Sequence, residues 1–289
     1  MFDLRYHVAS LAAVFVALLI GILVGVAMSG KVDDAEKQSL QSDVNRLEAQ
    51  LDAASERRAT GSREQKAFQD FVENAYPALI ADRLAGKRIA IAFVGPVDPA
   101  VRRHVERAVE DSGSGSPVRV RALKVPIDWT RIETQLDGEL ARYRGAGLEE
   151  LGGELARELV GGGETPTWDA LTPLIVEEKS GSFRRPADGV VIARTVKAQQ
   201  GETALFLKGF YRGLAEVDAP TIGVEPSSVS ASAVGTWSEM GLSTVDDIEA
   251  PAGKLALALL LEGSSIGNYG LKEAADDGIV PPIEAQPSG

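Results

Sequence analysis

Residues 88–94 read RIAIAFV, and Gly95 and Pro96 follow them at once. A short apolar run that ends at a turn signal is typical of a strand that is buried on both faces. Asp98 and Pro99 then predict the start of a helix that runs to about Asp111. A strand, a turn and a helix in this order make the first unit of an α/β fold.

The same alternation continues toward the C-terminus. Further strands are expected at 118–125, 189–195, 221–224 and 243–246, and helices at 129–143, 148–159, 168–178, 203–217 and 252–261. Helical crossovers of this length connect mainly parallel strands in a right-handed sense. We therefore predict a Rossmann-like α/β domain over 87–262, with helices on both faces of the sheet. A poorly ordered C-terminal tail is predicted over 263–289, where Gly, Ser, Asp and Pro dominate.

An uncharged apolar segment, 8–29, lies near the N-terminus. A helix of about 22 residues spans roughly 33 Å, enough for a hydrocarbon core of about 30 Å. We predict a single transmembrane helix in the cytoplasmic membrane. Residues 1–7 would be cytoplasmic and the bulk of the chain extracytoplasmic, because Arg5 precedes the segment and acids follow it. A cleaved signal peptide is the alternative, although the apolar region is longer than is usual for one.

Small residues recur at every fourth position of this segment. A ridge of this kind lets a second membrane helix approach closely, which predicts pairing. The ridge consists of Ala9, Ala13, Ala17, Gly21, Gly25 and Ser29. The alternative is composition alone, since small residues are common in membrane helices.

Residues 30–76 are polar and helical in pattern, and they predict a coiled-coil stalk. Apolar residues spaced by four and three form the expected seam of a homodimer, namely Leu40, Val44, Leu47, Leu51 and Ala54. Arg58 and Gly61 occupy the next two seam positions, which leaves open whether the helix continues through Gly61. The alternative is a single amphipathic helix that folds back on its own domain.

The composition excludes several classes of function. The net charge of −12 argues against nucleic acid as a partner, because a phosphate-binding surface needs clustered Lys and Arg. The absence of cysteine excludes disulfides, thiolate metal sites and thiol nucleophiles. The first predicted strand is followed by neither a dinucleotide fingerprint nor a P-loop. His104 alone cannot anchor a zinc site. Because the sequence shows none of these catalytic or cofactor-binding patterns, we predict neither an enzyme nor a bound cofactor.

Two loops follow predicted strands at the edge where a doubly wound sheet binds its ligands. Their candidate ligand residues are Glu225, Ser227, Ser228, Asp246 and Asp247. Acidic oxygens can hold a hard cation. The alternative is that these residues form turns and cap helices.

The two ends of the chain resemble the actinobacterial MctB family, whose members are described as copper transporters. The resemblance rests on 2–11 (FDLRYHVASL), Ser227-Ser228, 243–248 (STVDDI), 250–253 (APAG), 268–272 (NYGLK) and Pro281-Pro282. It implies copper efflux through a pore in the outer membrane. The residues do not favour this function, because copper(I) prefers Cys or Met and copper(II) prefers imidazole, whereas the chain has three methionines and two histidines. An outer-membrane pore would also show strands of about ten alternating residues.

Relatives in this family called SteB resemble envelope proteins that act with a membrane partner, SteA, to control a peptidoglycan hydrolase during cell separation. The leading hypothesis is therefore a dimeric, non-enzymatic scaffold, anchored in the lipid bilayer, with a SteA-like partner. Copper transport or channel formation is the alternative. An enzyme on the α/β domain is a third hypothesis, with its site at the loops near Glu225 and Asp246.

Overall fold

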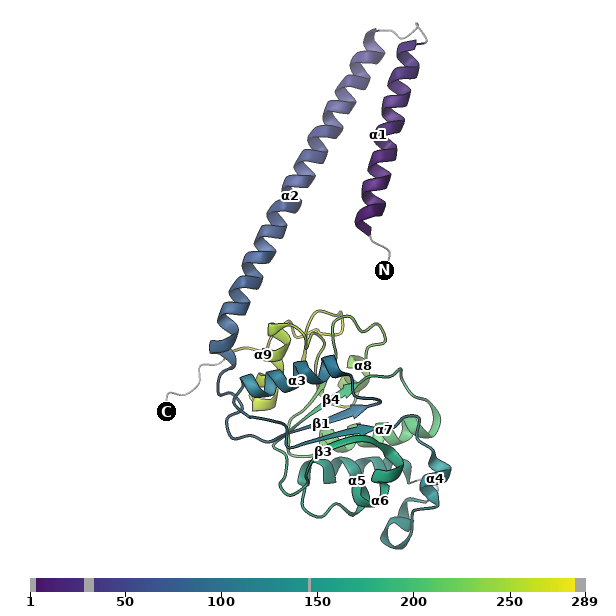
Figure 1. Ribbon diagram of the computed structural model, residues 1–289, viewed down its shortest axis with the longest axis vertical. Coiled ribbons are helices and arrows are strands. Elements are labelled where there is room, and N and C mark those ends of the chain that lie inside the picture. The colour runs from purple at the N-terminus through teal and green to yellow at the C-terminus, as the bar shows by residue number, and fades with distance from the viewer. Residues whose placement is uncertain (1–3, 29–33, 145–146, 284–289) are drawn as a thin grey trace. The chain divides into compact units, whose positions relative to one another are not determined.

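The computed structural model describes residues 4–28, 34–144 and 147–283 (Figure 1). The chain divides into two compact units, Met1–Gln69 and Asp70–Gly289. The first unit contains α1 (Leu4–Met28) and most of α2 (Asp34–Ile80). The second unit contains the end of α2 and the whole of the sheet.

The prediction of a transmembrane helix over 8–29 is corrected by the structure. Among the described residues, no helix is long and apolar enough to cross a membrane.

The helix α2 is continuous over 47 residues and passes through Gly61 without a break. A methyl group on Gly61 would meet no atom within 4 Å, so the glycine is not required by close packing. Pro77 lies inside the helix, close to its end at Ile80. The last turn belongs to the second unit, where Ile80 is buried against Leu255 and Leu259.

The second unit is an α/β domain around a mixed sheet. Within the described residues the strand order is β3-β2-β1-β4-β5-β6-β7. All neighbouring strands are parallel except β2 and β3, which are antiparallel, so the sheet is mixed but mainly parallel. The strands are β1 (Ile89–Val94), β2 (Arg119–Leu123), β3 (Val176–Gly181), β4 (Gly189–Arg194), β5 (Thr221–Val224), β6 (Ser243–Val245) and β7 (Asn268–Tyr269).

Helices cover both faces of this sheet (Figure 1). One face packs against α3 (Pro99–Asp111) and α9 (Pro251–Glu262). The other packs against α4 (Trp129–Glu133), α5 (Leu148–Gly161), α6 (Pro166–Ile175), α7 (Gly201–Glu216) and α8 (Val234–Glu239), with the short 3₁₀ helix η1 (Gly138–Tyr143). Side chains along β1 alternate between the two cores, with Ala92 in one and Phe93 in the other. This alternation explains why the whole strand Ile89–Val94 is apolar.

Three segments differ from the sequence-based expectation. The single helix expected over 129–143 is divided into α4 and the 3₁₀ helix η1. The helix expected to reach residue 178 ends at Ile175, and the charged residues after it form the edge strand β3. Charged side chains on an edge strand discourage further pairing, which is why this strand does not look like one in the sequence. The segment after Gly263, where little order was expected, contributes β7 and is described as far as Ile283.

Two arginines of β2 lie inside the second unit. Arg119 is 0% exposed, and its guanidinium donates to the backbone oxygens of Leu159 and Arg185. The carbonyl of Leu159 lies near the C-terminal end of α5, where a positive charge is favourable. Arg119 and Arg121 both stack on the ring of Phe183, at 4.8 and 4.4 Å from its centroid. Burial lowers the pKa of Arg119 to about 10.

Candidate functional site

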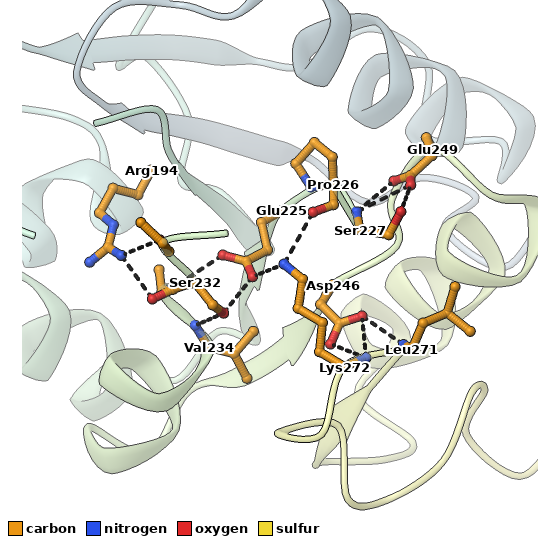
Figure 2. A network of polar contacts seen from close by, with 12 residues as sticks. Arg194, Glu225, Pro226, Ser227, Ser232, Val234, Asp246, Glu249, Leu271 and Lys272 are labelled. Carbon is orange, nitrogen blue, oxygen red and sulfur yellow. Dashed lines mark hydrogen bonds and ion pairs between the residues drawn. The ribbon is translucent and has the colours of Figure 1, made fainter. Parts of the chain in front are cut away.

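The two loops singled out in the sequence meet at the carboxyl edge of the sheet. Glu225 follows β5 directly and Asp246 follows β6, and these two strands are parallel neighbours. The backbone joins the loops, since the amide of Glu225 donates to the oxygen of Val245 at 2.9 Å. Figure 2 shows the side chains turned toward a third segment, which carries Leu271 and Lys272.

Glu225 is the centre of this network and is only 2% exposed. Its carboxylate accepts hydrogen bonds from the Ser232 hydroxyl and from the amide of Ala233, the latter at 2.8 Å. It also forms an ion pair with the ammonium group of Lys272, which donates in addition to the carbonyl of Pro226 at 3.2 Å. A buried carboxylate of this kind needs such partners to remain ionised.

Asp246 holds the backbone of the same C-terminal segment. It is fully buried and accepts from the amides of Leu271 at 2.7 Å and Lys272 at 3.1 Å. Gly270 has φ of +140°, and a Cβ there would overlap the Asp246 carboxylate. The close approach therefore requires glycine at this position.

Ser227 and Glu249 tie the two loops together a second time. The Glu249 carboxylate accepts from both the amide, at 3.1 Å, and the hydroxyl of Ser227. Ser228, the next residue, is exposed. The carboxylates of Glu225, Asp246 and Glu249 are thus bound to donors of the chain itself, as capping and turn residues would be.

Asp247 differs from these three acids. It is 1% exposed, and its Oδ1 atom has no hydrogen-bond partner within the described part of the chain. A Cβ on Gly253, in the first turn of α9, would come within 2.5 Å of that atom. Burial, helped by the charges of Asp246 and Glu249, raises the pKa of Asp247 to about 7. Asp247 is therefore a buried acid that titrates near neutral pH.

The residues with copper-binding chemistry lie far apart in the fold. His104 is on α3, on the face of the sheet opposite to the core against which Met240 packs. Burial and the charge of Lys254 lower the pKa of His104. Among the described residues, no three His, Cys, Asp or Glu side chains are arranged to hold a metal ion.

A doubly wound sheet binds ligands in the crevice where its strand order reverses. In this sheet the reversal lies between β1 and β4. Here the two strand ends are in contact, because the Thr195 hydroxyl donates to the carbonyl of Pro96 at 2.6 Å. A Cβ on Gly95 would come within 2.6 Å of the Val196 side chain. Protein side chains therefore fill the usual dinucleotide position.

The predicted ridge and seam lie on α1 and α2. Ala13, Ala17, Gly21 and Gly25 are exposed on α1, whereas the side chains of Ala9 and Ser29 lie outside the described residues. On α2, the side chain of Leu40 is also outside the described residues. Val44 is half-buried and Ala54 exposed, while Leu47 and Leu51 are 48% and 70% exposed. About half or more of each of these leucine side chains is therefore accessible to water.

Sequence reasoning missed Lys272, Glu249 and Ser232 as members of the network. Lys272 is 47 residues beyond Glu225, and no local pattern links the two. The run 268–272 was noted only for its family resemblance. Residues 263–267 fit the spacing G-x-S-x-G, but they follow the helix α9 instead of a strand, so they form no nucleophile elbow.

Comparison with known proteins places the chain in a family. A sequence model of the family described as "Copper transport outer membrane protein, MctB" matches residues 1–280. Proteins named copper transporter MctB from Mycobacterium bovis and from Mycobacterium tuberculosis H37Rv are each 23% identical over 315 residues. The alignment covers 95% of this chain and 98% of each relative. Because the match extends over nearly its whole length, the chain belongs to the MctB family.

Proposed function

We propose that this chain is a non-enzymatic interaction protein of the cell envelope that forms a homodimer through α2. The observation that carries the proposal is the continuity of α2 from Asp34 to Ile80 together with the exposure of its seam. Because the helix is unbroken, the seam positions before and after Gly61 lie on the same side of α2. Leucines that are about half or more exposed in a single chain gain free energy when a second helix covers them.

Apolar residues reappear at the seam positions of α2 beyond the polar interruption. Counting on from Ala54, the seam passes Arg58, Gly61 and Gln65 and then reaches Phe68 and Val72. Phe68 is 62% exposed, and the adjacent Phe71 is 68% exposed. A second copy of α2 would cover apolar residues on both sides of the polar interruption.

The carboxyl edge of the sheet supports a role without catalysis. Three of its acids, Glu225, Asp246 and Glu249, are bound to Lys272, to Ser227 and to backbone amides, whereas Asp247 is buried without a hydrogen bond to its Oδ1 atom in the described part of the chain. The α/β unit would then offer its surface to another protein. Resemblance to the SteB proteins suggests a SteA-like envelope partner and a role in the control of cell separation.

The test is the mass of the full chain in mild detergent, measured by light scattering during size-exclusion chromatography. We expect a dimer, and Leu47→Glu with Leu51→Glu should reduce dimerisation at least tenfold by placing charges in the seam. Ala49→Glu, on the opposite side of the helix, adds the same type of charge and should leave the dimer intact. A monomeric wild-type chain would rule out this assembly.

Copper transport is the second candidate, since the relatives are named copper transporters. Calorimetric titration of the full chain with copper(I) and copper(II), with zinc as the control, separates the two proposals. Saturable, copper-selective binding would favour transport. No heat with either ion would favour the interaction protein.

A further inference from the structure

A cavity of about 230 Å³ lies at the carboxyl end of β4. Its walls come from Arg194 at the end of that strand, from α7 and the two residues Ala198 and Gln199 that lie before it, and from α8 with the residue that follows it. The apolar part of the lining includes Ala204, Leu207 and Met240. The cavity therefore occupies the edge of the sheet at which α/β domains bind small ligands, one strand position away from the filled crevice.

The charge at this cavity is positive. Arg194 donates from Nη2 to the carbonyls of Ala231 and Ser232, both at 2.9 Å. Its guanidinium has no carboxylate partner within the described part of the chain, and Figure 2 shows it bound to the backbone beside Ser232. Lys208, the other cation of the lining, is held by Glu149 at 2.8 Å. Arg194 is thus left with its charge uncompensated and with further N–H donors available.

We propose that this cavity binds a small aliphatic carboxylate, with its acid group on Arg194 and its chain between α7 and α8. A guanidinium favours a carboxylate because two of its N–H groups match the two oxygens. The volume is equal to roughly eight water molecules at about 30 Å³ each, which suits an acid of four to six carbons. Leu207 and Tyr211 are nearly fully buried, and they form a rigid apolar wall for the hydrocarbon chain of the acid.

A larger cleft of about 620 Å³ between α5 and α7 does not share these properties. Two of its arginines are paired with acids, since Arg212 contacts Glu149 and Arg157 contacts Glu154, and the third, Arg142, donates to the Tyr143 hydroxyl. Glu150, which also lines it, is exposed to water. The smaller cavity is the one that combines an uncompensated cation with an apolar interior.

Calorimetry of the full-length protein with acetate, butyrate and hexanoate tests the proposal. Hexanol, which has the hydrocarbon chain without the carboxylate, is the control. We expect saturable binding that strengthens from acetate to butyrate or hexanoate, and at least tenfold weaker binding of hexanol. Arg194→Gln should weaken binding of the best acid about 10- to 100-fold through the lost charged hydrogen bonds. Arg103→Gln, an exposed arginine on α3, changes the net charge equally and should leave binding unchanged.

Ala204→Leu keeps the test valid if Arg194→Gln disturbs the fold, because it fills the cavity and leaves the arginine in place. It should reduce binding of hexanoate more than that of acetate. Thermal unfolding of each variant reports whether it is folded. No saturable binding of any acid by the wild-type chain, or equal binding of hexanoate by the Arg194→Gln variant, would overturn the proposal.

Discussion

Lys272 links its own segment to the loop after β5, because its ammonium group forms an ion pair with the carboxylate of Glu225, which is only 2% exposed. Lys272→Met should lower the free energy of unfolding by about 3 kcal/mol, since Glu225 is then a buried charge without its counter-ion. Urea unfolding followed by circular dichroism measures the change. Lys197→Met, at an exposed position, is the matched control and should have little effect. Equal midpoints for the two variants would mean that the ion pair contributes little.

Asp247 makes stability depend on pH. Its folded pKa of about 7 lies above the ordinary value of 3.8, so folding penalises the ionised form. The contribution of Asp247 to the free energy of unfolding is therefore most favourable below about pH 4. It becomes less favourable as the pH rises, and the destabilisation is complete above about pH 7.

Asp247→Asn should remove that loss. The gain in the free energy of unfolding should be near zero at pH 4 and rise to at most about 4 kcal/mol at pH 8, for a pKa difference of roughly three units. Thermal unfolding at a series of pH values checks this profile, with Asp218→Asn at an exposed site as the control. A gain that does not change with pH would show that Asp247 is not the titrating group.

At the scale of elements, α5 and α7 come into close backbone contact at their glycines. A Cβ on Gly209 would overlap the backbone oxygen of Glu149, and one on Gly152 would overlap that of Phe206. Gly209→Ala should therefore cost about 1–3 kcal/mol, even though alanine is the better helix former. Chemical denaturation gives the value. Gly235→Ala on α8, where a methyl group meets no atom within 4 Å, should be neutral or slightly stabilising.

The elements differ in how far the sequence predicts them. β1 and β4 were predictable because strands buried on both faces are apolar throughout. β3 was not, because an edge strand can carry Glu177, Glu178 and Lys179 on its surface. The burial of Arg119 was not predictable either, because a charged residue is normally expected at the surface. It is stabilised by the end of α5 and by Phe183, both distant in sequence.

The candidate site was predictable to a similar extent. The loops at Glu225 and Asp246 were identified because both follow strands, and carboxyl ends of parallel strands share one edge. Their partner Lys272 was not, because the contact depends on how β7 is added to the sheet. The cavity beside Arg194 combines α7, α8 and β4, so no single segment indicates it.

At the scale of the whole molecule, the chain divides into two compact units. Among the described residues, the three clusters of buried apolar side chains all lie in the unit Asp70–Gly289. A fragment of these residues should therefore unfold cooperatively, at a temperature within a few degrees of the corresponding transition of the full chain. Differential scanning calorimetry of both proteins tests this expectation. A fragment that unfolds more than about 10 °C lower would show that 1–69 stabilise the α/β unit.

The strand order also bears on synthesis. From β1, the strands β4, β5, β6 and β7 stand side by side in the same order in which they leave the ribosome. Each new strand therefore finds its neighbour already made, and no earlier strand must wait for a later one to be inserted beside it. The exception is Glu225, whose counter-ion is translated 47 residues later. The nascent chain consequently completes its charge balance at this edge only when its last strand has emerged.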